Sequence, residues 1–274
     1  MKYLKKILLA LFVVASAYLI LMPFAWMLST SLRPNHEVMR YPPIIFGGIY
    51  TLDKYPEFLR RWDFLRLFGN TMFVALASAI GAAFTSALAG FAFAKYSFKG
   101  KNAIFYGLMA TIMIPIFVIL VPMFIILNKF HWYDTYYALI VPFLASPLGI
   151  FLMRQFIYAI PNDLIYAARI DGCSEYRIFS KVIIPSTIPA LASLVILIFM
   201  LQWDSYLWPV IMTNSQKMKV LTTQLAMISR ENFASTNWNL TMVGAVLSTV
   251  PIVILFLFMQ RYFISSITMT GIKE

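Results

Sequence analysis

The side chains that could carry out chemistry in this chain are few and scattered. Cys173 is the only cysteine, and His36 and His131 are the only histidines. A single thiol excludes an internal disulfide and a thiolate metal cage, and two isolated imidazoles do not supply a histidine zinc site. No phosphate-binding loop is present either, because Gly100-Lys101 lacks the upstream glycine and the following hydroxyl. We therefore expect no catalytic residue, no metal and no cofactor on this chain, which would not be an enzyme by itself.

One polar cluster lies inside a long apolar stretch and is the best candidate for contact with a solute. It consists of Gln202, Trp203, Asp204 and Tyr206. If the stretch crosses a membrane, a carboxylate at mid-bilayer costs about 2.5–3.5 kcal/mol, so it usually faces protein or a wet cavity. Aromatic faces beside polar groups also suit sugars, whose C–H faces stack while their hydroxyls hydrogen-bond. The alternative stays open that the aromatic residues form an interfacial belt and that Pro209 simply ends the helix.

The composition indicates what must position these groups. Hydrophobic residues make up 61% of the 274 residues, whereas Lys, Arg, Asp and Glu together make up only 12%. An average soluble domain has roughly 45–50% apolar and about 25% charged residues, so much of this protein's surface must face lipid. The net charge is +11. The basic residues are nevertheless scattered between apolar blocks and form no basic face, so nucleic acid is not an expected partner.

Six stretches are apolar enough to cross a bilayer as helices, which takes about 20 residues. The chain is therefore predicted to be all-α, a polytopic membrane protein with six transmembrane helices in a single domain, 1–274. Its first stretch begins like a cleavable signal peptide, but the apolar run continues through residues 18–28, so we expect an uncleaved helix. The six stretches are residues 7–30, 71–94, 103–127, 135–153, 187–211 and 241–263.

The positive charges bear on the orientation of the chain. With the N-terminus inside, six spans place both termini in the cytoplasm, and the 22 Lys and Arg residues divide 12 inside and 10 outside. The split is nearly even because the long 31–70 segment carries six of them, and long loops obey the positive-inside rule poorly. The short basic clusters at residues 2–6 and 95–101 favour a cytoplasmic N-terminus.

Prolines and small residues mark places where the spans can bend or pack. Prolines 23, 115, 122, 142, 147 and 251 fall within the expected spans, and each removes a helix hydrogen bond. In membranes such breaks often line cavities or hinges, although each can equally be a static kink. The small-residue runs 77–83 and 87–92 permit close helix packing, either against a second subunit or within the chain.

The polar segment 161–185, on the expected cytoplasmic side, has strong local signals. Pro161 stands where a helix can begin, and the two residues after it can cap that helix. Gly172 supplies a backbone break, and Ser174 can cap a second helix. These signals predict a helix, a bend and another helix at the membrane face, which alone would also fit a plain interfacial linker. Residues three and four apart lie on the same face of a helix. The residues with this spacing here are Leu164, Ala167, Ala168 and Asp171.

The segment resembles the EAA loop of permease subunits from binding-protein-dependent ABC importers. The family pattern runs Glu-Ala-Ala, three residues, Gly, nine residues, then an aliphatic residue, one further residue and an aliphatic-Pro pair. Tyr166 replaces its glutamate. The other positions are matched by Ala167, Ala168, Gly172, Val182, Ile184 and Pro185. The resemblance covers essentially the whole chain and is closest to the maltose-type carbohydrate branch, through Thr30-Ser31-Leu32-Arg33-Pro34, Asn70-Thr71, Phe98-Lys99-Gly100-Lys101, Ile114-Pro115, Ile170-Asp171-Gly172, Trp203-Asp204 and Gly271-Ile272-Lys273.

What the resemblance implies is a permease for a disaccharide or oligosaccharide in the inner or plasma membrane of a prokaryotic cell. Its partners would be membrane lipid, a second homologous permease, two cytoplasmic ATPase subunits that bind the ATP, and an extracytoplasmic solute-binding protein that contacts the outer 212–240 segment. The EAA helix of such importers docks in a cleft of the ATPase, whose closure reorients the spans. The residues implied at this contact are Ala167, Ala168 and Gly172, with Tyr166 in place of the usual polar contact and the charges of Asp163, Arg169, Asp171 and Glu175 around it.

Two alternatives remain open at this point. The importer could carry another polar solute, such as glycerol phosphate, an amino acid or a polyamine. The chain could instead be independent of ATP, as a secondary carrier or a structural subunit. A carrier would favour coupling acids at mid-bilayer, and Asp204 is the only acidic residue within the expected spans.

Overall fold

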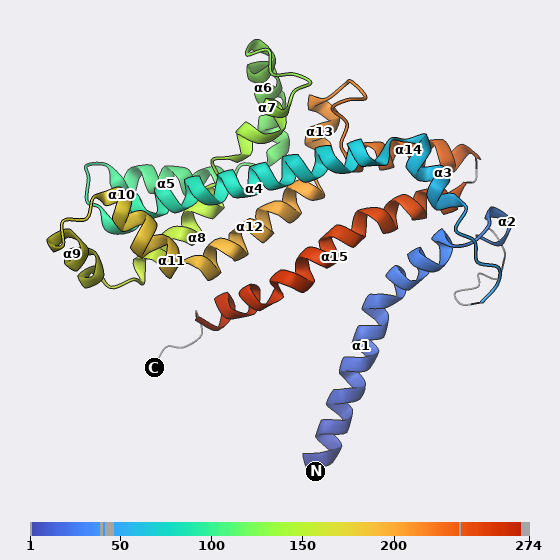
Figure 1. The fold of residues 1–274 in the computed structure, drawn as a ribbon, viewed down its shortest axis with the longest axis horizontal. Coiled ribbons are helices and arrows are strands. Elements are labelled where there is room, and N and C mark those ends of the chain that lie inside the picture. Colours follow the sequence, from blue (N-terminus) through green and yellow to red (C-terminus); the bar gives the residue numbers. More distant parts are fainter. Residues whose placement is uncertain (1, 39–40, 42–46, 236, 270–274) are drawn as a thin grey trace. The chain divides into compact units, whose positions relative to one another are not determined.

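A computed structural model describes residues 2–38, 41, 47–235 and 237–269 (Figure 1). Every regular element in these ranges is a helix, which confirms the all-α prediction. The Gly271-Ile272-Lys273 motif lies outside the described residues. The elements are α1 (Lys2–Ser31), α2 (Asn35–Val38), α3 (Lys54–Arg61), α4 (Phe64–Lys95), α5 (Lys101–Ile112), α6 (Ile116–Lys129), α7 (Tyr136–Ile140), η1 (Val141–Phe143), α8 (Pro147–Tyr158), α9 (Asn162–Ile170), α10 (Glu175–Ile178), η2 (Phe179–Ile183), α11 (Ile184–Ser186), α12 (Ile188–Trp203), α13 (Leu207–Met212), α14 (Leu221–Ser235) and α15 (Trp238–Met269).

Four helical stretches of the described chain are long and apolar enough to cross a membrane: Tyr3–Ser31, Phe64–Lys95, Tyr136–Tyr158 and Trp238–Phe258. Two bent pairs raise the number to six if each pair is one span: Lys101–Ile112 with Ile116–Lys129, and Glu175–Ser186 with Ile188–Trp203. Each candidate includes one of the six stretches expected from the apolar pattern, or most of it. Helices form there because lipid offers no hydrogen bonds, so the backbone must satisfy its own polar groups.

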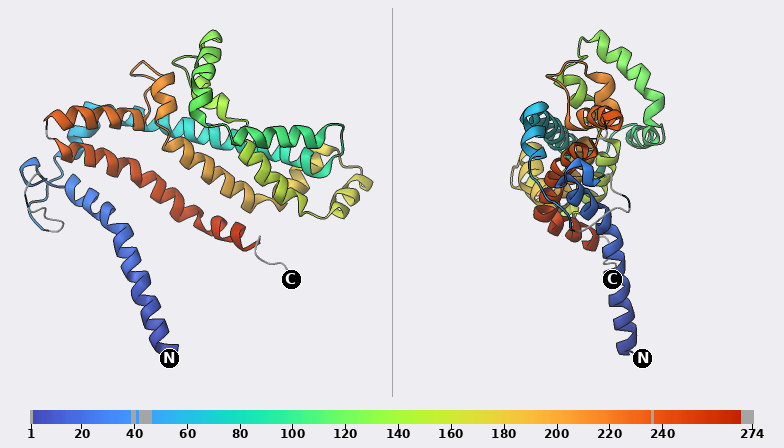
Figure 2. Two further views of the ribbon diagram at one scale, coloured as in Figure 1. Left: turned by 180° about the vertical axis from the view of Figure 1, so that it is seen from behind. Right: turned by 90° about the vertical axis from the view of Figure 1, so that its right-hand side faces the viewer.

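Three of the expected spans are interrupted. The helix of the third is broken between α5 and α6, which meet at 104°, and Figure 2 shows α6 turned sharply away from α5. Pro115 lies at this break. The helix is interrupted there because proline donates no N–H and disfavours helical backbone in the residue before it. The fourth span passes through the short helix η1 before α8 begins at Pro147. The fifth is interrupted between Trp203 and Leu207.

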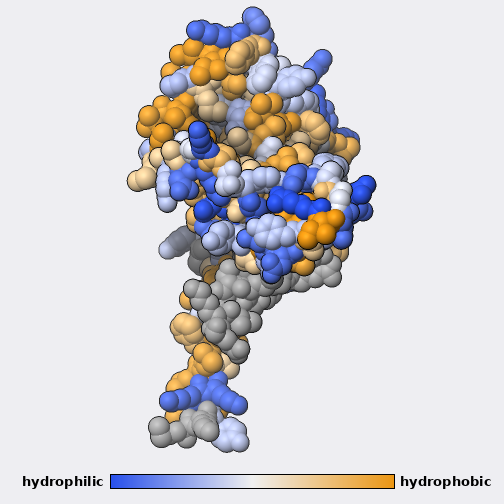
Figure 3. Space-filling model, turned by 90° about the vertical axis from the view of Figure 1, so that its left-hand side faces the viewer, coloured by the Kyte–Doolittle hydropathy of each residue, from blue (hydrophilic) through white to orange (hydrophobic). Residues whose placement is uncertain are grey.

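The chain divides into two compact units, residues 1–67 with 223–253 and residues 68–222 with 254–274. In the first unit, hydrogen bonds tie the end of α1 to α3 and to the start of α15. The Ser31 and Tyr55 hydroxyls lie 2.9 Å apart, and the Asn239 amide donates to the Arg33 carbonyl at 3.1 Å. The most apolar part of α1 is 0% buried within the chain, and Figure 3 shows hydrophobic side chains along it.

In the second unit, α4 packs closely along α8. A Cβ atom added at Gly90 would lie 2.8 Å from the Met153 Cβ and 2.9 Å from the Arg154 backbone nitrogen, closer than real Cβ atoms approach. On the other helix, a Cβ at Gly149 would meet the Ser86 hydroxyl. The small residues of α4 therefore serve packing within the chain, which is one of the two roles expected for them.

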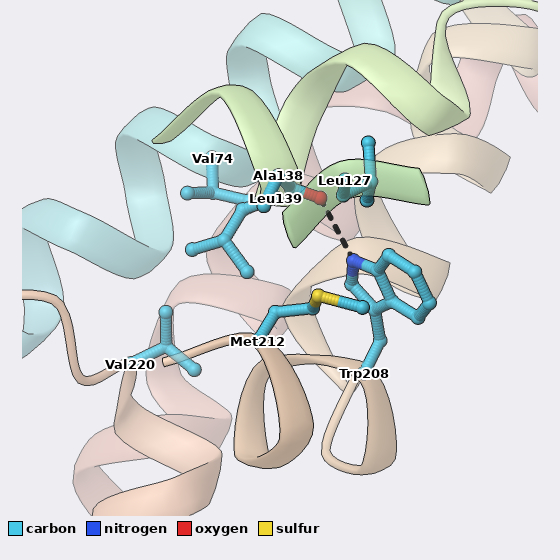
Figure 4. Packing of buried hydrophobic residues seen from close by; sticks show 7 residues of the cluster. All are labelled: Val74, Leu127, Ala138, Leu139, Trp208, Met212 and Val220. Carbon is cyan, nitrogen blue, oxygen red and sulfur yellow. Dashed lines mark hydrogen bonds between the residues drawn. The ribbon is translucent and has the colours of Figure 1, made fainter. Parts of the chain in front are cut away.

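A hydrophobic cluster in the second unit joins α4, α6, α7 and α13 (Figure 4). The indole N–H of Trp208 donates to the Ala138 carbonyl at 2.9 Å, so the polar group of this buried ring is satisfied. The bond holds α13 against α7 beyond the break in the fifth span. The buried members of the cluster are Val74, Leu127, Ala138, Leu139, Trp208, Met212 and Val220.

The segment before α12 changes its helical type and its direction. η2 is a π-helical turn with Phe179 and Ile183 buried. The helical stretch Glu175–Ser186 meets α12 at an angle of 80°. At this bend the Thr187 hydroxyl donates to the Ile183 carbonyl at 2.9 Å, which satisfies an acceptor near the change in direction.

Candidate coupling and transport sites

The 161–185 segment folds as its local signals predict. α9 ends at Ile170, and two residues later the chain turns at Gly172, whose φ of +74° lies in the left-handed region that favours glycine. The N–H groups of Gly172 and Cys173 donate to the carbonyls of Arg169 and Ala168, each at 3.0 Å. Ser174 then caps α10 by accepting from the Arg177 N–H. One detail of the prediction is wrong: Pro161 occupies the cap position of α9, and no side chain hydrogen-bonds to its first turn.

Most of the residues expected to contact an ATPase lie on an exposed surface of α9 and the following bend. Ile165 is buried and anchors α9. Two exposed apolar residues were missed by the sequence reasoning, Ile170 at 86% and Tyr176 at 77% exposure. Ile170 follows Tyr166 by four residues, and this helical spacing was the available signal. Figure 3 views this end of the second unit, where hydrophobic side chains lie among hydrophilic ones. The expected residues are exposed at Asp163, Tyr166, Ala167, Arg169, Asp171, Gly172 and Glu175 and half-buried at Ala168.

Two of the expected charges bind each other and the end of α4. The Arg169 guanidinium donates to the Glu175 carboxylate at 2.8 Å and lies 5.8 Å from the centre of the Tyr96 ring. The Tyr96 hydroxyl also donates to Glu175. Hydrogen bonding to Glu175 raises the pKa of Arg169, while burial and then the hydrogen bond to Glu175 raise the pKa of Tyr96. At neutral pH the pair is therefore charged and the phenol keeps its proton.

A second contact fixes the start of the segment to the same helix end. The Lys95 ammonium donates to the Asn162 side chain at 2.9 Å and to the Tyr158 carbonyl at 3.3 Å. It also donates to the carbonyl of Ile160. Contacts to Lys95 at the end of α4 and to Tyr96 just after it thus hold the chain before and after α9.

The four candidate pathway residues lie in different surroundings. Trp203 is 2% exposed, stacked on Phe199 with ring centres 5.5 Å apart and edge-on to Phe68. In this conformation its ring belongs to the packing of the second unit. Gln202 is half-buried, whereas Asp204 and Tyr206 are exposed where α12 has ended.

A cavity of about 590 Å³ lies beside Gln202 in the second unit. Its polar lining consists of Thr111, Ser146, Gln202 and Ser205, and Phe143 contributes an aromatic ring. These residues come from the breaks in the third, fourth and fifth spans. The sequence reasoning named only Gln202 among them, because a lone Ser or Thr in an apolar run gives no signal of which way it faces.

Asp134, which the sequence reasoning also missed, organises the loop after α13. Its backbone, with a φ of +58°, donates to the Met212 carbonyl at 2.9 Å. Its carboxylate accepts from the N–H groups of Asn214 and Ser215 at 2.8 and 3.1 Å. Burial alone would raise the pKa of Asp134, but these hydrogen bonds outweigh it and lower the pKa. Among the described residues, no three His, Cys, Asp or Glu side chains gather as metal ligands would.

Comparison with known proteins shows which family and which characterised permeases this chain is similar to. The family model for the inner membrane component of binding-protein-dependent transport systems matches residues 82–269. The arabinooligosaccharides transport system permease protein AraQ of Halalkalibacterium halodurans is 34% identical over 94% of this chain and 92% of its own length. The sn-glycerol-3-phosphate transport system permease protein UgpE of Rhizobium meliloti is 30% identical over 95% of both chains.

Two solved structures share the fold. One is a chain of a bacterial ABC transporter involved in the import of the acidic polysaccharide alginate, with a TM-score of 0.82 and 20% identity over 95% of this chain and 97% of that chain. The other is a chain of the bacterial alginate ABC transporter in complex with alginate pentasaccharide-bound periplasmic protein. Its TM-score is 0.66, with 14% identity over 94% of both chains.

Proposed function

Since the chain belongs to the family of inner membrane components of binding-protein-dependent transport systems, we propose that it is the permease subunit of an ATP-driven carbohydrate importer. Residues 1–274 act as one permease domain with both termini in the cytoplasm of a prokaryotic cell. A second homologous permease completes the pathway, two ATPase subunits bind the ATP, and an extracytoplasmic binding protein delivers the solute to the outer 212–240 segment.

The observation that carries the proposal is the exposed apolar surface of α9 and the following bend. More than half of the surface is exposed at four apolar or aromatic residues of this segment, Leu164, Tyr166, Ile170 and Tyr176, and exposed charges stand beside them at Asp163, Arg169 and Asp171. Large exposed apolar side chains with a polar rim are typical of protein–protein contacts. Because the chain belongs to the family of binding-protein-dependent transport components, an ATPase subunit is the partner that we assign to this surface.

The carbohydrate assignment has separate support. The relative AraQ is named for arabinooligosaccharides, and the cavity next to Gln202 offers an aromatic ring beside neutral polar groups. Glycerol phosphate is the second candidate solute, because the relatives named UgpE are almost as similar. ATP hydrolysis by the reconstituted complex, measured with binding protein loaded with each solute, distinguishes the two.

A substitution at Gly172 tests the coupling role. In Gly172→Leu the left-handed backbone costs a side-chain-bearing residue about 1–2 kcal/mol, enough to lower the population of the docked geometry about 5–30-fold. We expect transport per ATP hydrolysed to fall by that order in reconstituted vesicles, while the protein still inserts. Nothing lies within 4 Å of a Cβ at Gly172, so the effect comes from the backbone and not from a clash.

The matched control is Gly100→Leu. Gly100 has a similar φ of +80° and similar free space, but it lies in the loop after α4 and outside the coupling segment. It should keep normal coupling. Normal transport per ATP in Gly172→Leu would overturn the coupling role of this segment. Failure of any ATPase to copurify with the wild-type chain would overturn the proposed function itself.

A further inference from the structure

Three interrupted spans of the second unit meet at one cavity. The end of α5 contributes Thr111, the start of α8 contributes Ser146, and the end of α12 contributes Gln202 and Ser205 to the space of about 590 Å³. Non-helical backbone at membrane depth is tolerated only where protein covers it or where it lines a water-filled cavity. The convergence of three such breaks indicates a wet chamber and not three unrelated kinks.

The polar groups of the chamber are all uncharged. They are two Ser hydroxyls, one Thr hydroxyl and the Gln202 amide, and no Lys, Arg, Asp or Glu lines the space within the described residues. The Gln202 side chain is half-buried and makes no hydrogen bond to another described residue. A half-buried amide without a partner is suited to binding a ligand or water.

One wall of the chamber is a fixed aromatic ring. Phe143 lies edge-on to Trp208, with ring centres 5.8 Å apart and planes at 89°. Trp208 is itself held by its hydrogen bond to the Ala138 carbonyl at 2.9 Å. A ring supported in this way keeps its orientation, so it can offer one face to a flat apolar surface such as the C–H face of a sugar.

We propose that this chamber binds an uncharged polyhydroxylated solute, a segment of a neutral oligosaccharide, on its way through the membrane. Gln202 and the hydroxyls of Ser146 and Ser205 bond its hydroxyls, and Phe143 stacks on a ring. The volume lies in the range of about 300–1,000 Å³ that is usual for small-molecule sites. The inference rests on the proposed function and selects between its two candidate solutes.

Glycerol phosphate does not fit this lining. Its dianion would enter a largely apolar space without a cationic side chain, and an unpaired charge there is strongly disfavoured. The N-terminus of α8 does not replace the missing cation. Pro147 has no N–H to offer, and the N–H of Gly149 is already taken by the Ser146 hydroxyl at 3.1 Å. Of the first three positions of α8 only Leu148 still offers an N–H, which does not neutralise a dianion.

The test uses the whole transporter with a single reporter thiol. Cys173, the only native cysteine, is replaced in Cys173→Ser, and Thr111→Cys or Ala145→Cys is added to that chain, because both positions line the chamber and neither is a proposed ligand of the solute. The assembled complex is treated with a water-soluble thiol reagent alone, with a mixture of arabinotriose and maltotriose, or with sn-glycerol 3-phosphate. Lys99→Cys, in a cytoplasmic-side loop away from the chamber, serves as the matched control.

We expect both chamber thiols to react, and the trisaccharides at about ten times their Kd to slow the reaction about tenfold. Glycerol phosphate should not slow it, and Lys99→Cys should react equally in all three conditions. Thiols that do not react mean a dry or lipid-filled space and overturn the proposal, as do thiols that no sugar protects. Equal protection by glycerol phosphate overturns the restriction to uncharged solutes.

A separate measurement on the same complexes distinguishes an incorrect chamber assignment from an incorrect proposed function. Binding-protein-stimulated ATP hydrolysis by the wild-type complex tests only whether the chain serves an importer. If hydrolysis is stimulated while the chamber thiols stay unprotected, the chamber is wrong and the importer stands. If no loaded binding protein stimulates hydrolysis, the importer itself is wrong.

Discussion

Single residues differ in how much of their role lies in the fold and how much in transport. Asp204 is exposed, and only its backbone takes part in ending α12, through an N–H bond to the Met200 carbonyl at 3.0 Å. Trp203 next to it is packed against Phe199 and Phe68. Two adjacent candidates thus divide into a structural ring and a carboxylate that is free to meet solute or water.

Asp204→Asn should alter transport more than assembly. An exposed substitution away from such contacts changes the free energy of unfolding by about 0.5 kcal/mol or less. Loss of a charge-assisted hydrogen bond to solute costs about 1.5–3 kcal/mol, so uptake should fall roughly tenfold or more. The measurement compares initial uptake rates at equal amounts of assembled complex, with exposed Asp53→Asn as the control. Unchanged uptake kinetics would count against a transport role for Asp204.

Asp134 makes the loop after α13 sensitive to acid. Its pKa in the folded protein lies below the usual value near 4, because backbone N–H groups bind the carboxylate. A depressed folded pKa means that the bonds contribute fully above about pH 4 and are lost as the pH falls through the lower folded value. We expect faster amide exchange at Asn214 and Ser215 below that pH, after correction for the intrinsic pH dependence of exchange.

The substitution Asp134→Ala should reproduce the acid effect at neutral pH. Removing the acceptor lowers amide protection at Asn214 and Ser215 by about 1–2 kcal/mol, or 5–30-fold. Asp53→Ala is the matched control, because Asp53 precedes α3 without a side-chain capping bond. Protection that is the same in both variants would show that the loop is held by other contacts.

The role of a single residue can be predicted from the sequence when its interactions are with neighbouring residues in the chain. The break at Gly172 and the cap at Ser174 could be predicted because glycine and serine act on their own backbone or on residues three positions away. The burial of Trp203 could not, because it depends on Phe68 in a helix far away in the chain. Asp134 was missed for the same reason, since its partners lie in a distant loop.

At the scale of elements, the close contact of α4 with α8 depends on Gly90, which has no side chain. Gly90→Ala would place a methyl group 2.8–2.9 Å from atoms of Met153 and Arg154, one of them backbone. Such overpacking typically costs about 1–3 kcal/mol. We expect a lower thermal midpoint of the purified complex. Gly69→Ala in the same helix is the control, since nothing lies within 4 Å of that site, and it should be neutral or slightly stabilising. Equal midpoints would contradict the close packing.

The prolines of the spans show where prediction of elements stops. Pro115 stands at a 104° break, Pro142 lies in η1 and Pro147 begins α8, whereas Pro23, Pro122 and Pro251 lie inside α-helices. Pro147 stands at the first position of α8 and removes no helix hydrogen bond, whereas Pro23, Pro122 and Pro251 each remove one and the helix still continues. Neighbouring groups that satisfy the freed backbone decide whether a helix continues, and these neighbours are set by tertiary packing.

At the scale of the whole molecule, the low share of charge and the apolar runs were sufficient to predict a helical membrane protein. They do not give its orientation, since the Lys and Arg residues divide almost evenly between the two sides. Within the first unit, the described residues leave the most apolar length of α1 unburied.

The native cysteine allows the orientation of the chain to be measured. Cys173 is the only cysteine and is half-buried in the coupling segment. With both termini inside, a membrane-impermeant thiol reagent should leave Cys173 unmodified in intact cells and modify it in inverted vesicles. Exposed Gln216→Cys in a Cys173→Ser chain should show the opposite pattern. Modification of Cys173 in intact cells would reverse the proposed orientation.

The π-helical turn η2 fixes how α9 and α12, the helices before and after it, are rotated relative to each other. A π-turn holds one residue more than the α-helical turn it interrupts, and one residue corresponds to about 100° of rotation about a helix axis. Deleting a single residue from Phe179–Ile183 would keep the charge pair and the helices on either side, yet turn the exposed face of α9 about a quarter of the way round. The extra residue therefore sets the rotation of α9 relative to α12, and in the proposed coupling role it would also set the direction in which α9 acts on the membrane helices.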